Sequence, residues 1–137
     1  MKVRMLGGEE LALRWHLIEP YVGRSLAYGS GDVSTYDLFI ECLASQSQCW
    51  IREDEYGTLH GVAITRILTH KQYKELVIVT TTSDGWFEHG PEILDLLEDF
   101  ARGVGCKYTS VYGRKGWARV LKKHGYEEPF TTLMKEL

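Results

Sequence analysis

The sequence predicts an α/β fold, a mixed central sheet of about five to six strands with three to four helices. Two apolar runs, 76–82 and 106–112, have the length and the β-branched content of buried strands. The segment between them, 90–104, has apolar residues at helical spacing. A strand, a helix and a second strand with short joints form a parallel pair with a right-handed crossover. We therefore expect 76–82 and 106–112 to be neighbouring parallel strands.

Length and composition favour a single domain over residues 1–137, because 44% hydrophobic and 26% charged residues can form a buried core. The formal net charge of −3 makes no case for nucleic acid as a partner. No apolar run reaches the roughly eighteen residues of a membrane span, and the start has no apolar signal-peptide region. Three scattered cysteines are typical of a reducing compartment. We expect a cytoplasmic protein without a membrane partner.

Two helices are expected before the first long strand. The first covers 9–28, and Pro20 should break or kink it near Glu19, because proline lacks an N–H and clashes with the preceding turn. The second should begin at Asp32 as the N-cap. The first apolar stripe consists of Leu11, Trp15, Ile18 and Val22, and the second of Val33, Tyr36, Ile40 and Leu43.

The remaining elements complete the sheet. Strands are expected at 48–52 and 58–68 around a polar hairpin loop, with a bulge at Gly61. A short helix after 106–112 should turn Trp117 toward the core. A last strand is expected at 130–137. The connection 83–89 should be a loop, with Pro91 in the first helical turn after it.

The last third of the chain carries a family resemblance. Its pieces are Gly105-Cys106, Gly113-Arg114-Lys115-Gly116-Trp117-Ala118-Arg119-Val120-Leu121, Gly125-Tyr126 and Leu133-Met134-Lys135-Glu136-Leu137. With the order of the elements, they resemble the GNAT (GCN5-related N-acetyltransferase) acyltransferases. The closest likeness is to small GNAT-like proteins of tailed phages and prophages. The first half of the chain matches this family only in the order of its elements.

The resemblance implies that acetyl-CoA, the co-substrate, lies in a splay between the strands at 76–82 and 106–112. Its pantetheine amides would pair with the main chain near three consecutive strand residues, and its pyrophosphate would bind the loop before the helix at 90. Helix N-termini favour anions through free N–H groups and the helix dipole. Basic residues at the start of the next helix would also bind a phosphate. The implied cofactor-binding residues are Val79, Thr80, Thr81, Gly85, His89, Gly90, Arg114 and Lys115.

The chain departs from the family pattern at three positions. Glu88 stands where members have a glycine, and Gly85 stands where they have arginine or glutamine. Leu121 stands where many members have a tyrosine that protonates the leaving thiolate. Two functions therefore stay open. The first is an N-acyltransferase that moves an acetyl group to a small-molecule amine or a protein by direct attack. The alternative is a catalytically degenerate phage protein, cytoplasmic or virion-associated, that binds a second copy or an assembly partner.

The sequence does not single out a catalytic residue. His60 and His89 could act as bases near neutral pH, and Glu53 and Glu75 could each take a proton from an amine. Cys106 has no adjacent base in the sequence. No pair of histidines or cysteines has metal-ligand spacing, so no metal site is expected.

Charge is distributed unevenly along the second half. The segment 84–101 has six acidic residues and no lysine or arginine, whereas 102–124 has seven lysines and arginines and no acid. The pattern fits two solvated helix faces of opposite sign. It also fits a basic segment that meets an anionic ligand.

Overall fold

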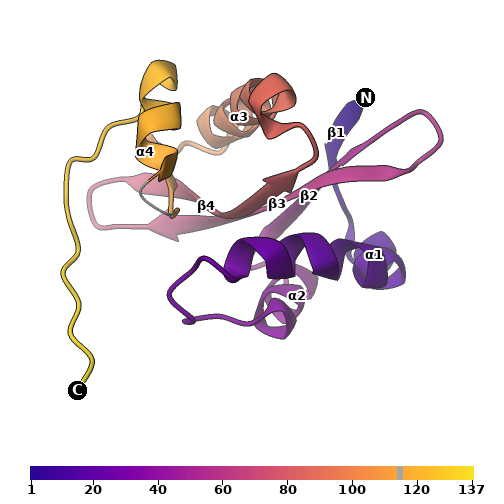
Figure 1. Ribbon diagram of the computed structural model, residues 1–137, viewed down its shortest axis with the longest axis horizontal. Helices are drawn as coiled ribbons and strands as arrows, with labels where there is room; N and C mark the ends of the chain where they lie inside the picture. Colours follow the sequence, from indigo (N-terminus) through magenta and orange to yellow (C-terminus); the bar gives the residue numbers. More distant parts are fainter. Residues whose placement is uncertain (114–115) are drawn as a thin grey trace.

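Five strands form one mixed sheet in the order β1-β2-β3-β4-β5 (Figure 1). The neighbours β1 to β4 pair antiparallel, whereas β4 and β5 are parallel. The computed structural model describes residues 1–113 and 116–137, and for 86–89 the backbone alone. The predicted parallel pair is confirmed. The strands are β1 (Lys2–Met5), β2 (Gln48–Glu53), β3 (Leu59–Thr69), β4 (Lys74–Ser83) and β5 (Tyr108–Val111).

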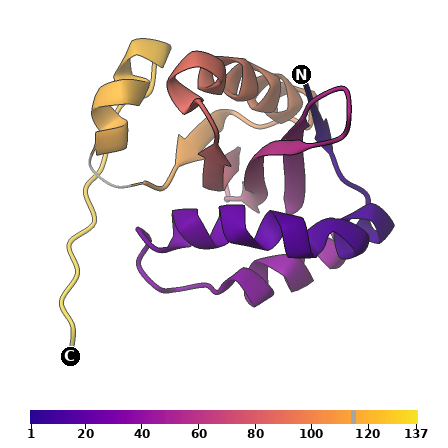
Figure 2. The same cartoon turned by 45° about the vertical axis from the view of Figure 1, so that its right-hand side comes forward.

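Helices cover both faces of the sheet (Figures 1 and 2). One face packs against α1 (Gly8–Leu26) and α2 (Thr35–Leu43). The other packs against α3 (Trp86–Gly103) and α4 (Gly116–Leu121), which continues into a short 3-10 turn at Lys122–His124. The described residues thus contain four helices and five strands, numbers within the range of three to four helices and five to six strands that the sequence predicts.

The core under α1 and α2 confirms one expected stripe and corrects the other. On α1, Leu11, Ile18 and Val22 are buried, and the helix is continuous across Pro20, so the chain does not break there. On α2 the buried residues are Leu38 and Cys42. The expected stripe on this helix was wrong, because Tyr36 and Ile40 are exposed and Leu43 is 40% exposed.

The N-cap of α2 is Ser34 rather than Asp32. The Asp37 N–H donates to the Ser34 hydroxyl, and the Ser34 N–H donates to the Asp37 carboxylate. This capping box satisfies two N–H groups of the first turn that have no partner within the helix. Asp32 instead accepts a hydrogen bond from the Ser30 hydroxyl, outside the helix.

The core under α3 is centred on Leu76, Ile78 and Leu97, which are at most 1% exposed. The ring of Trp50 meets Phe100 edge-on at 5.0 Å, and its indole N–H donates to the hydroxyl of Thr65. The partly buried Trp117 packs against the same cluster. Trp117 therefore faces the core as expected, at its margin rather than at its centre.

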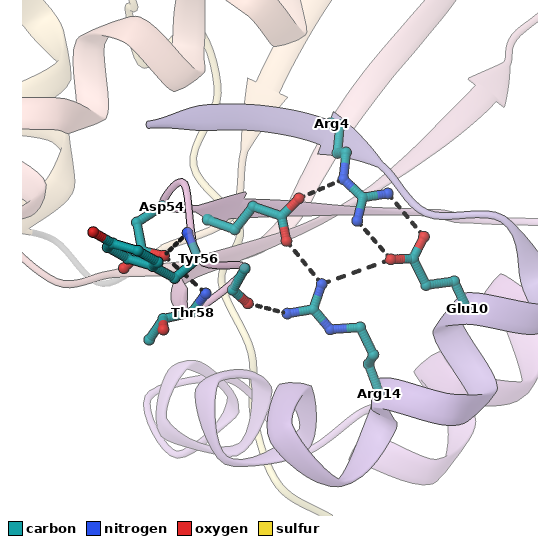
Figure 3. A network of polar contacts seen from close by, with 8 residues as sticks. Arg4, Glu10, Arg14, Asp54, Tyr56 and Thr58 are labelled. Carbon is teal, nitrogen blue, oxygen red and sulfur yellow. Dashed lines mark hydrogen bonds and ion pairs between the residues drawn. The ribbon is translucent and has the colours of Figure 1, made fainter.

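A network of alternating charges joins β1, α1 and β2. Figure 3 shows Arg4, Glu10 and Arg14 pointing toward one another. Arg4 binds Glu10 through two nitrogens and Glu53 through Nε at 2.6 Å. Arg14 reaches the other oxygen of Glu53 at 2.9 Å, and also the carbonyl of Gly57 in the β2–β3 loop. These contacts tie the first strand and the first helix to the hairpin.

Two expectations about the ends of elements were wrong, and one strand was not predicted. The unpredicted strand is β1, whose four residues form one edge of the sheet. The helix α3 begins at Trp86, so 86–89 is helical rather than part of a loop. Residues 130–137 form no strand, and their side chains are exposed. In the part of the chain that the structure describes, no helix combines the length and the apolar character needed to cross a membrane.

Candidate functional site

The parallel strands β4 and β5 separate halfway along β4. Their pairing runs from Glu75 opposite Tyr108 to Ile78 opposite Val111, and it ends there. β4 nevertheless continues to Ser83, because its other edge stays paired with β3. Beyond Ile78 the main chain of β4 therefore has no strand beside it on the β5 side within the described residues. This is the splay that the family resemblance implied.

A bulge lies where the splay opens. On β3 the consecutive residues Ile64 and Thr65 are opposite Thr80 and Ile78, so Val79 is the extra residue on β4. A bulge locally bends a strand and interrupts its ladder of hydrogen bonds. Next to it, the Thr80 hydroxyl is fully buried and has no hydrogen-bond partner among the described residues. Val79, Thr80 and Thr81, three of the predicted binding residues, thus lie together at this irregularity.

An apolar recess adjoins the splay on the side of α3 and α4. It is a shallow recess with a cavity volume of about 10 Å³, room for about one water molecule, and it opens to solvent. Trp117 and Leu121 form its α4 wall, and Gly90 is buried in its α3 wall. The lining residues are Ile78, Thr81, Gly90, Ile93, Leu94, Leu97, Val111, Trp117 and Leu121.

Gly85 makes the connection between β4 and α3 shorter than predicted. Its φ of 66° and ψ of 42° lie in the left-handed region that glycine adopts without steric cost. The chain therefore reverses directly after Asp84, and the helix begins at Trp86. Gly90 and Pro91 consequently lie in the second turn of α3, so the expected place of Pro91 in the first turn was wrong. The first free N–H groups of α3 belong to residues 86–89.

The structure brings only part of the predicted phosphate site together. Gly85 caps α3 and Gly90 lines the recess. The side chain of His89 lies outside the described residues, and so do Arg114 and Lys115 altogether. Their assignment to phosphate binding stays a prediction.

Arg52 binds the residues that precede α3, and the sequence analysis did not identify it as a site residue. It is 4% exposed, and its Nη1 donates to the hydroxyl of Ser83 and to the carbonyl of Asp84, both at 3.1 Å. These bonds hold the last residue of β4 and the turn that follows it. The sequence did contain a signal, because Arg52 directly follows the apolar residues of β2. A charged residue inside a strand is seldom buried unless it has a partner.

Glu75 is the best-defined candidate base. Its carboxylate, 16% exposed, accepts a 2.5 Å hydrogen bond from Ser110 on β5 and lies 2.6 Å from Nε2 of His70. Partial burial raises the pKa of Glu75, but the bonds from Ser110 and His70 outweigh it and leave the pKa below its usual value. Glu75 lies two residues from Val77, so both side chains are on the same face of the sheet. Ile78, which lines the recess, is on the opposite face.

Two of the other candidate bases, Glu53 and His60, have structural partners. Glu53 is held by Arg4 and Arg14, which lower its pKa. His60 lies 3.0 Å from the Asp54 carboxylate in the hairpin, and this contact is the main reason why the pKa of Asp54 is lowered. Cys106 is half-buried, and no group of three His, Cys, Asp or Glu among the described residues could hold a metal ion.

Comparisons with known proteins agree on the fold. No family model and no curated protein matches the sequence. A probable acetyltransferase of known structure superposes with a TM-score of 0.77 at 15% identity, covering 100% of this chain and 98% of the other. The ribosomal-protein-alanine N-acetyltransferase of Brucella melitensis biovar Abortus 2308 gives a TM-score of 0.75 at 10% identity, covering 100% of both chains.

A third structure is an aminoglycoside acetyltransferase from an uncultured soil metagenomic sample, in complex with sisomicin. It gives a TM-score of 0.72 at 15% identity and covers 99% of this chain and 95% of the other. Identities this low establish the architecture and leave the chemistry to the residues themselves. The mixed sheet with its parallel splayed pair, together with these likenesses, shows that the chain has the GNAT fold.

Proposed function

We propose that this protein is an N-acetyltransferase that uses acetyl-CoA and acetylates an amine. The observation that carries the proposal is the opening between β4 and β5 beyond Ile78, beside the apolar recess. An acyl-CoA arm needs main-chain partners for its amides and an apolar surface for its methylenes. The exposed edge of β4 and the recess meet both needs.

Val79, Thr80 and Thr81 would hold the pantetheine through their main chain. Gly85, His89 and Gly90 would lie by the pyrophosphate, with Arg114 and Lys115 adding positive charge. Acetyl-CoA, when bound, would supply a thioester that an amine attacks directly.

Glu75 would accept the proton of the attacking amine. Its lowered pKa keeps it ionised at neutral pH, and Ser110 and His70 fix its orientation. Because Glu75 and the recess lie on opposite faces of the sheet, the amine would approach from the α1 and α2 side and the donor from the α3 and α4 side. Positioning of this kind accounts for much of the rate of a direct transfer.

The acceptor is a small-molecule amine or a protein. The solved relatives include proteins named for a ribosomal-protein alanine and for an aminoglycoside, so the fold accommodates both kinds. A non-catalytic role, such as phage assembly, is the second candidate. It is favoured by the helical conformation of 86–89, which replaces the expected phosphate loop with the first turn of α3.

Thermal shift with acetyl-CoA tests the proposal. A ligand that binds only the folded state raises the melting temperature, so acetyl-CoA and CoA should both stabilise the protein. The variant Gly90→Leu would fill the recess and abolish the shift. Gly103→Leu is the matched control, because it changes the same residue type in the same helix at a site with nothing within 4 Å. Absence of any shift with the unmodified chain would favour the non-catalytic role.

A further inference from the structure

Arg52 is a buried charge without a counter-charge among the described residues. It is 4% exposed, and its hydrogen bonds go to two neutral oxygens, the Ser83 hydroxyl and the Asp84 carbonyl. No described carboxylate lies within ion-pair distance of its guanidinium. A buried charge is normally paired, because its removal from water costs free energy. The described neighbours of Arg52 therefore do not account for its charge.

The surroundings of Arg52 suit an apolar residue. Arg52 lines a small recess together with Trp50, Ala63 and Ile93, and the cavity volume is about 10 Å³. The same three residues belong to the core under α3. A guanidinium loses hydration in such a place, whereas an apolar side chain of similar size would not. Packing of the core thus does not require an arginine here, which points to a ligand.

A missing side chain on β3 lets Arg52 reach β4. Arg52 lies opposite Gly61, and Gly61 lies opposite Ser83, so the three positions share one face of the sheet. Neighbouring strands are about 4.8 Å apart, so the Arg52 side chain has to span roughly 10 Å to Ser83. A Cβ at Gly61 would lie 2.9 Å from Ser83 Oγ and 3.1 Å from Ser83 Cβ. The Arg52 side chain therefore crosses β3 at the one residue that has no side chain.

The guanidinium of Arg52 ends beside the positive end of α3. Asp84, whose carbonyl accepts its hydrogen bond, immediately precedes the N-cap residue Gly85. Free N–H groups and the helix dipole already make this end positive, so a cation here is unfavourable unless an anion is bound. The segment 84–101 has no lysine or arginine of its own. The buried cation and the free N–H groups together suit a phosphate.

We propose that Arg52 is a positioning residue for the diphosphate of the acyl donor, a role that rests on the proposed function. From behind the turn its charge attracts the phosphates, and its two hydrogen bonds hold the turn that presents the N–H groups of residues 86–89. A class of donor follows from this arrangement. The site selects thioesters that carry a diphosphate, as CoA does, over the same acyl group on pantetheine, which has no phosphate.

Calorimetry with three ligands tests the role of Arg52. CoA and dephospho-CoA contain the diphosphate, and pantetheine does not. Arg52→Met should weaken the binding of the first two about tenfold, the effect of one nearby charge, and leave pantetheine unchanged. It should also reduce the salt dependence of CoA binding, which the loss of a merely structural contact would not do. Arg52→Lys keeps the charge and should recover most of the affinity.

Gly61→Ala tests the path across β3. Its methyl group would displace Ser83, so the affinity for CoA should fall although the charge of the protein is unchanged. Two control variants should bind CoA like the unmodified chain. Gly103→Ala adds the same methyl group where nothing lies within 4 Å, and Arg102→Met removes a charge from a 70% exposed side chain at the end of α3. Melting temperatures without ligand show whether each variant is folded.

Inorganic pyrophosphate separates the role of Arg52 from the proposed function. If pyrophosphate raises the melting temperature of the unmodified chain but not of Arg52→Met, and acetyl-CoA has no effect, the anion site stands and the acetyltransferase is overturned. If acetyl-CoA binds and Arg52→Met binds it as tightly, or loses CoA and pantetheine equally, the role of Arg52 is overturned and the proposed function stands. Binding of neither ligand would overturn both.

Discussion

Ser110 on β5 donates a 2.5 Å hydrogen bond to Oε2 of Glu75 on β4. Ser110 lies one register position, and Glu75 three positions, before the last pair of the two strands, Ile78 and Val111. Nε2 of His70 lies 2.6 Å from the other oxygen of the same carboxylate. Both oxygens of Glu75 are thus held, and His70, with a 40% exposed side chain, connects the carboxylate to solvent. A base that is oriented by two neighbours and linked to water is suited to repeated proton transfer.

Glu75→Gln should lower kcat by about 10²- to 10⁴-fold, the usual contribution of a general base. The amide keeps the shape of the carboxylate, so the affinity for acetyl-CoA measured by calorimetry should not change. Asp99→Gln is the control, since Asp99 is an exposed acid at the end of α3. An unchanged kcat in Glu75→Gln would remove Glu75 from the mechanism.

Ser110→Ala should move the acidic limb of the pH–rate profile to higher pH. The Ser110 hydrogen bond lowers the pKa of Glu75 by favouring its charged form, so its loss raises the pKa. A base with a higher pKa becomes protonated earlier as the pH falls. A profile with an unchanged acidic limb would show that another group controls it.

The three cysteines should differ in reactivity. Burial raises the pKa of Cys42 and of Cys49 to about 12, so at pH 8 only about one in 10⁴ of these thiols is ionised. Cys106 is half-buried and therefore more accessible. One thiol should react quickly with a disulfide reagent in the native protein, and Cys106→Ser should abolish this fast phase. Fast reaction of three thiols in the folded state would contradict the buried positions.

The charge network should make stability depend on pH in the acidic range. Arg4 and Arg14 lower the pKa of Glu53 in the folded state. Its contribution is therefore present above the unfolded pKa of about 4.3 and is lost as the pH falls toward the folded pKa. Glu53→Gln should reduce the free energy of unfolding by about 1–2 kcal/mol at pH 7, and the difference should shrink in acid. The control Glu9→Gln, an exposed acid in the first turn of α1, should leave the acid dependence unchanged.

The periodicity of apolar residues in the sequence predicted the elements that are buried in the core. The apolar run of β4, the stripe Leu11, Ile18 and Val22 on α1, and the parallel partner β5 all follow from burial, which dominates local preferences. The periodicity was less informative for α2, because a nine-residue helix with apolar residues around its circumference fits more than one stripe. Residues 130–137 were predicted as a strand because of their apolar pattern, although among the described residues no strand pairs with them.

The position of the candidate site could be predicted where it depends on the backbone of β4, and could not be predicted where it depends on residues distant in the sequence. Val79, Thr80 and Thr81 follow from the run of β4 and the family resemblance. Arg52, which holds the turn before α3, comes from a strand more than thirty positions earlier, and only the register of the sheet brings it there. The early start of α3 depends on the left-handed conformation of Gly85, which a glycine permits but does not require.

The last prediction concerns Glu88, in the first turn of α3. A carboxylate at a helix N-terminus satisfies the dipole and the N–H groups that a phosphate would need. Two like charges about 6 Å apart repel by roughly 3 kcal/mol at an effective dielectric near 20, and salt and exposure should reduce this to about 1 kcal/mol. Glu88→Gly removes this repulsion and also leaves space for the ligand. Because 1.4 kcal/mol is tenfold in affinity, the substitution should tighten CoA binding about fivefold or more.

Glycine will also weaken the helix by up to about 1 kcal/mol, so the melting temperature of Glu88→Gly without ligand must be measured as well. Isothermal titration at low and moderate salt compares the two proteins, with Glu92→Gly, an exposed acid one turn further along α3, as the control. If the unmodified chain already binds acetyl-CoA at micromolar concentration and Glu88→Gly binds no better, the first turn of α3 accepts phosphate as it is, and the acid at 88 does not compete for the site.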